Sequence, residues 1–209
     1  MSCRVSGCYQ RATRYGALCN KHKTNHRRHG EPLQEGITAA ALKPYLGIAR
    51  RLIERNADKD IWAILDEQWS SAVAQSEAYM AGYFAGRPAP QHERKARSEV
   101  LKVAKRVKPQ TLIETVIAIF IMQEYEPRRF RSDRAFRFQL ARRVRRLTDV
   151  NAGEYWDHVT GKVKRVYRDL APRATEGFVR IVIEAIGGPA LYLAQRAIEA
   201  ANERAEREL

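Results

Sequence analysis

Hydrophobic positions along most of this chain recur every three to four residues, a spacing that predicts amphipathic helices. The stretches with this pattern are residues 38–55, 60–83, 93–107, 109–125, 132–147, 172–187 and 189–209. A weaker pattern predicts a further helix over residues 154–170, and few β signals appear outside residues 9–18. The sequence therefore predicts a mainly α-helical protein in which a helical bundle follows a short polar N-terminal segment.

Proline and glycine mark the expected boundaries between these helices. The segment Arg87-Pro88-Ala89-Pro90 predicts a linker, because two prolines stop a helix and stiffen the chain beyond it. Pro44 predicts a break or a start within the first long helix, and Gly187-Gly188-Pro189 predicts a helix end followed by a turn. We divide the chain into an N-terminal module (1–36), a helical segment (37–90) and a basic helical domain (91–209). Residues 109–125 are apolar nearly all round, which predicts the central core helix.

The N-terminal segment contains all three cysteines of the chain, in the pattern Cys3-x4-Cys8-x10-Cys19-x2-His22. Three thiolates and one imidazole form a closed tetrahedral site of the kind that holds structural Zn²⁺. So short and polar a segment cannot fold by burying apolar surface, and metal binding would supply on the order of 10 kcal/mol. His26, one helical turn after His22, is an alternative fourth ligand.

The order of residues predicts a treble-clef-like arrangement for this module. Gly7 and Cys8 suit a knuckle turn, since glycine permits a positive φ. Residues 9–18 suit a short hairpin, and Cys19 with His22 suits the first turn of a helix that runs to His29 and ends at Gly30.

Residues 1–32, with Cys3, Cys8, Cys19-x2-His22 and the run from Arg27 to Pro32, resemble a small zinc-finger motif of bacteriophage and mobile-element proteins. This motif is often found near or inside HNH-type endonucleases. The resemblance implies a zinc-bound treble clef that is used on DNA, and it does not extend beyond residue 32. HNH chemistry needs a general-base histidine and further metal ligands, but residues 9–18 contain no His, Asp or Glu. A divergent HNH-like nuclease that uses His26 or His29 is therefore the minority alternative.

Composition adds a strong positive charge to this picture. The chain has 209 residues, with 38 Lys and Arg against 24 Asp and Glu, a formal net charge of +14. Such an excess favours a polyanionic partner, nucleic acid above all. The most apolar run, residues 116–122, is far shorter than the roughly 20 residues that span a bilayer, so we expect no membrane partner. An odd number of clustered cysteines is unlike a disulfide framework and predicts a reducing cytoplasm, in a bacterial or phage-infected cell if the resemblance holds.

The positive charge is concentrated in three parts of the chain, residues 1–36, 87–108 and 127–149. Residues 127–149 alone carry nine Arg against two Asp, interleaved with Phe130, Phe136 and Phe138. Phe136 falls on the apolar stripe and is expected in the core, whereas Phe130 and Phe138 are open between core packing and stacking on bases. The residues predicted to contact nucleic acid are Arg11, Arg14, Lys21, Asn25, Arg27, Arg28, Arg94, Arg97, Lys102, Lys105, Arg128, Arg129, Arg131, Arg134, Arg137, Arg142, Arg145 and Arg146.

These observations favour a non-catalytic, zinc-containing nucleic-acid-binding protein, with DNA preferred over RNA. A short helix that carries Lys, Asn and Arg suits the major groove, although contacts to phosphate alone are an equal possibility. The second alternative is a subunit of a nucleoprotein complex whose helices contact other proteins. The acidic segment 52–86 and the alanine-rich C-terminus would suit such a protein partner.

Overall fold

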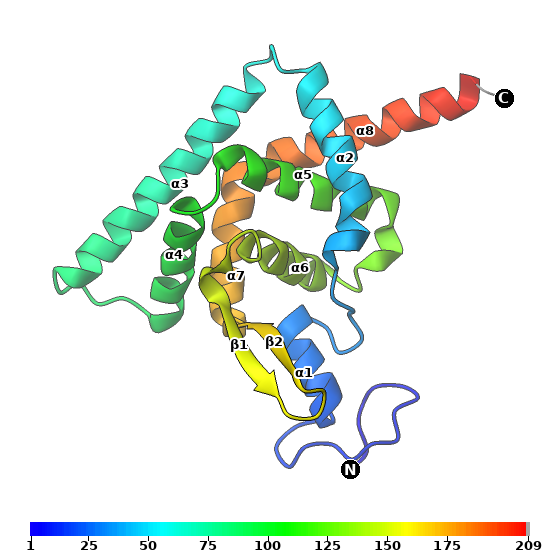
Figure 1. The fold of residues 1–209 in the computed structure, drawn as a ribbon, viewed down its shortest axis with the longest axis vertical. Helices are drawn as coiled ribbons and strands as arrows, with labels where there is room; N and C mark the ends of the chain where they lie inside the picture. The colour runs from blue at the N-terminus through cyan, green and yellow to red at the C-terminus, as the bar shows by residue number, and fades with distance from the viewer. Residues whose placement is uncertain (208–209) are drawn as a thin grey trace.

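The computed structural model describes residues 1–207 and shows a mainly α-helical protein, as predicted (Figure 1). The helices are α1 (Asn20–His29), α2 (Ala39–Arg55), α3 (Ile61–Phe84), α4 (Gln91–Ala104), α5 (Pro109–Tyr125), α6 (Asp133–Arg145), α7 (Pro172–Val182) and α8 (Gly188–Arg207). Two strands, β1 (Ala152–Asp157) and β2 (Lys162–Tyr167), form the one sheet within these residues. Short 3₁₀ helices cover Pro127–Arg129 and Asp149–Asn151. Glu208 and Leu209, the predicted end of the last helix, lie outside the described residues.

Most helix ends lie where the local sequence chemistry predicts them. The Thr38 and Ser132 hydroxyls accept hydrogen bonds from the amides of Ala41 and Ala135, which caps α2 and α6. Proline occupies the first turn of both α5 and α7. Pro44, predicted to break or start a helix, lies inside α2, which continues through it.

Helix α5 lies at the centre of the hydrophobic core. Its residues from Leu112 to Met122 are all buried, between α2 on one side and α8 on the other. Helix α4 packs against α3 and α7 beside this centre. The same core includes Leu42 and Trp69 from the segment 37–90 and Phe178 from α7. No side chain of residues 1–36 belongs to this core cluster, so the N-terminal module stands outside it.

The predicted helix over residues 154–170 is wrong, because this segment forms an antiparallel β-hairpin. Tyr155 lies opposite Lys164, and Trp156 lies opposite Val163. The β-branched and aromatic residues here favour strands over a helix. Gly161, with φ +59°, supplies the left-handed turn residue that a tight connection needs.

The predicted turn at Gly187-Gly188-Pro189 is also wrong. A π-helix, Ile183–Gly187, joins α7 directly to α8, and Figure 1 shows α8 running at an angle to α7. A Cβ on Gly187 would lie 2.8 Å from Cγ2 of Ile183, so glycine permits this tight turn where a terminus was expected. By length and composition the continuous run Pro172–Glu203 could also cross a membrane, but 61% of its most apolar window is buried, as in a core helix.

Candidate metal centre and the basic surface around it

Cys3, Cys8, Cys19 and His22 come together at the N-terminal end of the molecule. Their ligand atoms all lie within 4.8 Å of one another. Nδ1 of His22 is 3.3 Å from Sγ of Cys3 and 3.4 Å from Sγ of Cys19, and the Cys8 and Cys19 sulfurs are 4.0 Å apart. Cys3, Cys19 and His22 are buried. These four residues, predicted from their spacing alone, could hold a metal ion.

The backbone around the cluster explains how so short a segment brings its ligands together. Gly7 adopts φ +74°, and the amide of Cys8 donates to the carbonyl of Val5, which forms the expected knuckle. Cys19 is the N-cap of α1, so His22 lies in the first turn and faces the same point. Gly30 ends α1 in the left-handed conformation, with φ +86°.

Residues 9–18 differ from the expected regular hairpin. An isolated bridge joins Ser2 to Arg11, and the amide of Thr13 donates to the carbonyl of Leu18, but no β-ladder forms. Isolated backbone hydrogen bonds, such as those from Cys3 to Gln10 and from Arg4 to Ala17, join the loop ends beside the sulfur cluster.

The sulfur atoms influence one another's ionisation. Burial raises the pKa of Cys3, but hydrogen bonds from backbone amides and His22 outweigh this and lower it to about 6. For Cys8 the largest single effect is a backbone hydrogen bond at Gln10, which lowers the pKa. Burial and the sulfurs of Cys3 and Cys19 raise it by more in total, so the net shift of the Cys8 pKa is upward. Packing several thiolates together is unfavourable without a cation, and a bound metal ion would remove that penalty.

His26 and His29 face helix α6 and take no part in the cluster. Nε2 of His26 lies 3.1 Å from the Arg134 guanidinium, and Nε2 of Gln139 donates to Nδ1 of His29 over 3.0 Å. Burial and the positive charge of Arg142 lower the pKa of His29 to about 4. The cluster therefore uses His22 as its imidazole ligand, and the alternative ligand His26 helps to seat α1 on α6.

Several basic residues of the module are exposed around the cluster. Arg11, Arg14, Lys21 and Arg27 project into solvent and form no ion pair within residues 1–207. Two other predicted contacts are engaged within the protein. Nδ2 of Asn25 donates to the carbonyl of Pro32, and Arg28 pairs with Asp169 at 2.9 Å.

The arginine-rich helix α6 is turned inward more than its sequence suggested. Arg134 pairs with Glu176, Arg142 with Asp169 and Arg145 with Glu99, so these three neutralise carboxylates of the protein itself. The other predicted arginines here have no ion pair in the described part of the chain; they are Arg128, Arg129, Arg131, Arg137 and Arg146.

The phenylalanines of this region belong to the core. Phe136 is buried as expected, with its ring centroid 5.0 Å from that of Phe120 and 5.2 Å from that of Phe130. Phe130 and Phe138 are buried as well, so none of the three is free to stack on a base.

The basic segment on α4 is also only partly free. Lys102 pairs with the buried carboxylate of Glu99, and Arg97 donates to Ser76. The Arg94 guanidinium lies 4.2 Å from the centroid of Tyr83, whereas Lys105 is exposed.

Comparison with known proteins assigns no family to this chain. Compared with models of protein families, with curated proteins and with solved structures, it has no match. The resemblance of residues 1–32 to phage-type fingers therefore rests on those residues alone.

The β-hairpin is the largest exposed feature that the helical prediction missed. Tyr155 and Trp156 are about half exposed, at 50% and 53%. The concentration of valine, tyrosine and tryptophan on either side of Gly161 is the signal that could have found it.

Proposed function

We propose that this protein is a non-catalytic, zinc-containing DNA-binding protein. The observation that carries the proposal is the convergence of three cysteines and one histidine beneath a set of exposed cations. The ligand set is soft to borderline and closed, which favours a structural Zn²⁺ over hard cations such as Mg²⁺.

Three of the six ligand pairs have spacings close to those of a tetrahedral zinc site, and all four ligand atoms lie within 4.8 Å of one another. With Zn–S near 2.3 Å and Zn–N near 2.0 Å, tetrahedral ligands lie about 3.8 Å apart for sulfur pairs and about 3.5 Å apart for sulfur and nitrogen. The Cys8 and Cys19 sulfurs are 4.0 Å apart, and Nδ1 of His22 lies 3.3 Å and 3.4 Å from Sγ of Cys3 and Cys19. Zinc there would hold the loops and α1 as one rigid unit.

That rigid unit presents cations suited to phosphate. Lys21 and Arg27 on α1 and Arg11 and Arg14 on the preceding loop are exposed and free of ion pairs in residues 1–207. A helix fits the major groove of B-form DNA, whereas the major groove of A-form RNA is too narrow for one, which favours DNA. The engagement of His26 and His29 with α6 supports a non-catalytic role.

A binding titration tests the proposal. We expect a fluorescein-labelled duplex of about 30 base pairs to bind the metal-loaded protein, with log Kd changing linearly with log salt, by about 0.9 per phosphate neutralised. Lys21→Ala/Arg27→Ala should weaken binding and reduce this slope by about two units. Lys43→Ala/Arg55→Ala removes the same charges from exposed positions on α2 and is the control.

Three results would overturn the proposal: no binding to duplex DNA, binding that does not change with salt, or equal losses in the two double variants. Elemental analysis that finds no zinc in the purified protein would remove its metal part. Binding to RNA or single strands in place of duplex would point to a subunit of a nucleoprotein complex.

A further inference from the structure

The β1–β2 hairpin is exposed on both faces, which is unusual for a sheet. Between Gly153 and Val166 all strand residues except Asp157 are exposed. A two-stranded hairpin alone in water is only marginally stable, so a hairpin with two exposed faces needs stabilising contacts from the rest of the protein or from a partner. The stabilising contacts lie at its root.

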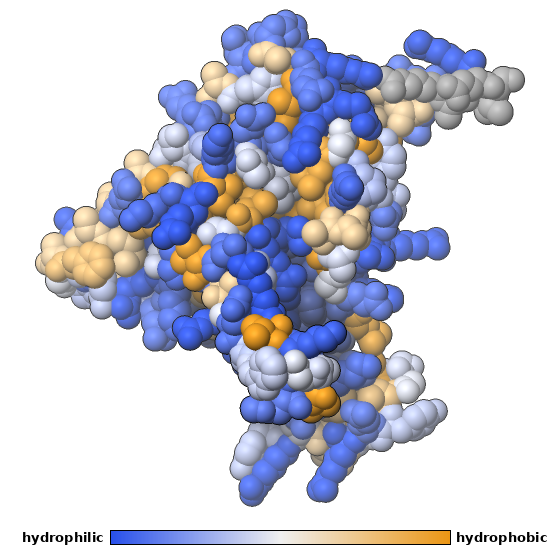
Figure 2. Space-filling model, viewed as in Figure 1, coloured by the Kyte–Doolittle hydropathy of each residue, from blue (hydrophilic) through white to orange (hydrophobic). Residues whose placement is uncertain are grey.

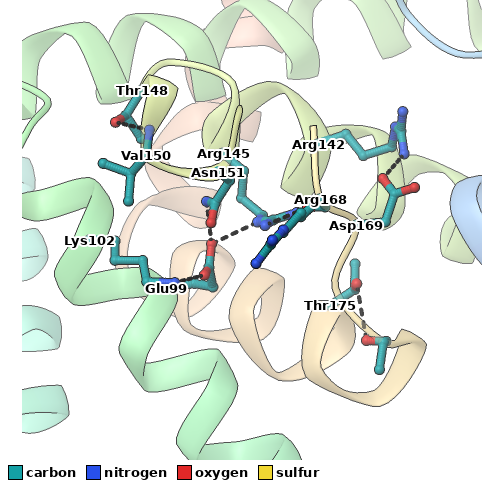
Figure 3. Close-up of polar contacts among 11 residues, drawn as sticks. Glu99, Lys102, Arg142, Arg145, Thr148, Val150, Asn151, Arg168, Asp169 and Thr175 are labelled. Atoms are coloured by element: carbon teal, nitrogen blue, oxygen red, sulfur yellow. Dashed lines mark hydrogen bonds and ion pairs between the residues drawn. The ribbon is translucent and has the colours of Figure 1, made fainter. Parts of the chain in front are cut away.

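A buried polar network fixes both ends of the hairpin to the helical body (Figure 3). The carboxylate of Glu99 on α4 accepts hydrogen bonds from Asn151, just before β1, over 2.7 Å and from Nε of Arg145 over 2.8 Å. Nη2 of Arg145 donates to the carbonyl of Arg168, just after β2, over 2.9 Å. This network therefore fixes the orientation of the hairpin relative to the helical body, while both faces of its strands remain exposed to solvent.

The hairpin and its root carry positive charge. Strand β2 and the following residue contribute Lys162, Lys164, Arg165 and Arg168, and carboxylates of Asp157 and Asp149 pair with Lys164 and Arg165. A cavity of about 400 Å³ opens at the root, and its lining contains Arg168, Arg145 and three cations of α4 against the two carboxylates of Glu99 and Asp169. The cations of α4 are Arg94, Lys95 and Lys102.

The hairpin and the metal-bearing module lie on the same side of the molecule. Figure 1 shows the hairpin beside α1, and Arg28 of α1 pairs with Asp169, two residues after β2. In Figure 2 hydrophilic side chains extend around this end of the molecule, with a few apolar groups on the hairpin. A partner that lies along α1 therefore also meets the hairpin.

We infer that the β1–β2 hairpin is a second DNA-binding arm, an inference that rests on the proposed function. The major groove, about 12 Å wide, admits a two-stranded ribbon as well as a helix. The face that carries Tyr155, Lys162 and Lys164 approaches the duplex, since residues directly opposite or two apart share a face. On this face Lys164 is paired with Asp157, and Lys162 has no ion pair within residues 1–207. On the other face the one cation of the two strands, Arg165, is paired with Asp149 and lies opposite Glu154. The cavity at the root takes a backbone phosphate.

The test compares hairpin variants with charge-matched controls in the same duplex titration. We expect Lys162→Ala/Lys164→Ala to weaken binding about tenfold near physiological salt and to lower the salt slope by about one to two units, because Lys164 already shares its charge with Asp157. Lys43→Ala/Lys59→Ala removes two exposed lysines from α2 and the loop after it, and should weaken binding by less than about threefold. Tyr155→Ala should weaken binding more than Trp156→Ala, which alters the opposite face.

Two further variants and readouts complete the design. Arg168→Ala should weaken binding in the same way, because it removes a cation from the root cavity without touching the strands. Far-UV circular dichroism and Tm of each variant should match the wild type, because all of the substituted side chains are exposed.

The outcomes separate the arm from the proposed function. If the wild type binds and Lys21→Ala/Arg27→Ala weakens it, but the hairpin variants behave like the α2 controls, the arm inference fails and the proposed function stands. If the wild type does not bind duplex, both fail. Hairpin variants that change self-association in sedimentation without changing DNA affinity would also overturn the inference, in favour of a protein contact.

Discussion

Glu99 shows how much a single residue contributes to this structure. Its carboxylate and the Arg145 guanidinium are both nearly inaccessible, with side-chain exposures of 4% and 8%. Burial raises the pKa of Glu99, but hydrogen bonds and charges of Lys102 and Arg145 outweigh this and lower it below its ordinary value of 4.5. Its ionised form therefore stabilises the fold above pH 4.5, and the stabilisation is lost as pH falls through the lowered pKa.

We expect Glu99→Ala to lower the free energy of unfolding by about 3–5 kcal/mol at neutral pH, because it leaves Arg145 buried and unpaired. Glu176→Ala is the control, since its pair with Arg134 is exposed at 39% and 45% and is worth less than about 1 kcal/mol. Urea unfolding followed by circular dichroism measures both. Equal losses would show that the network at the hairpin root contributes no more than a surface pair.

At the scale of single residues, the sequence predicts metal ligands better than it predicts the ion-pair partners of arginines. The four metal-binding candidates were found from spacing, because chelation by neighbouring residues is a local property. The internal ion pairs of Arg134, Arg142 and Arg145 were not predicted, because their carboxylate partners are 27 to 46 residues away along the chain. Only the packing of α4 and α7 against α6 decides which guanidinium groups remain free.

At the scale of the element, local chemistry predicted the helix ends at Thr38, Pro109, Ser132 and Pro172 but failed at the two-glycine segment. Gly187 is buried and a Cβ there would meet Ile183, whereas Gly188 is exposed and a Cβ there would meet nothing within 4 Å beyond its chain neighbours and its own helix backbone. Two glycines that read alike in sequence thus have different roles. The first permits the π-turn, and the second precedes Pro189 in a helical conformation, where the absence of a Cβ avoids a clash with the proline ring.

Alanine substitutions should separate these two roles. Gly188→Ala should change stability by less than about 1 kcal/mol, because the gain in backbone entropy is offset by contact between its Cβ and the ring of Pro189 at a helical φ of −60°. Gly187→Ala should lower stability by about 1–3 kcal/mol through overpacking against Ile183. Thermal unfolding measures both. If Gly187→Ala proves as stable as Gly188→Ala, the π-turn does not depend on glycine.

On the scale of the whole molecule, the core and the N-terminal module are stabilised by different forces. The core cluster begins at Ile37 and is apolar, which the hydrophobic periodicity predicted. The module is joined to α6 by polar contacts, such as Ser132 to Glu31 and Gln139 to His29. It buries little apolar surface beyond Cys3 and Cys19, so we expect metal coordination to supply its folding free energy.

Removing the metal should therefore unfold the module and leave the helical body intact. We expect a chelator, or Cys8→Ser, to expose residues 1–36 to protease and to leave a resistant fragment that begins near Ile37, while the helical circular dichroism signal falls only slightly. Duplex affinity should fall with the module, because the cations of α1 lose their fixed positions. Ser6→Ala, at an exposed position beside the knuckle, should behave like the wild type. Cooperative loss of the whole helical signal on chelation would show instead that core and module fold as one unit, and that the polar contacts between α1 and α6 are far stronger than their exposure implies.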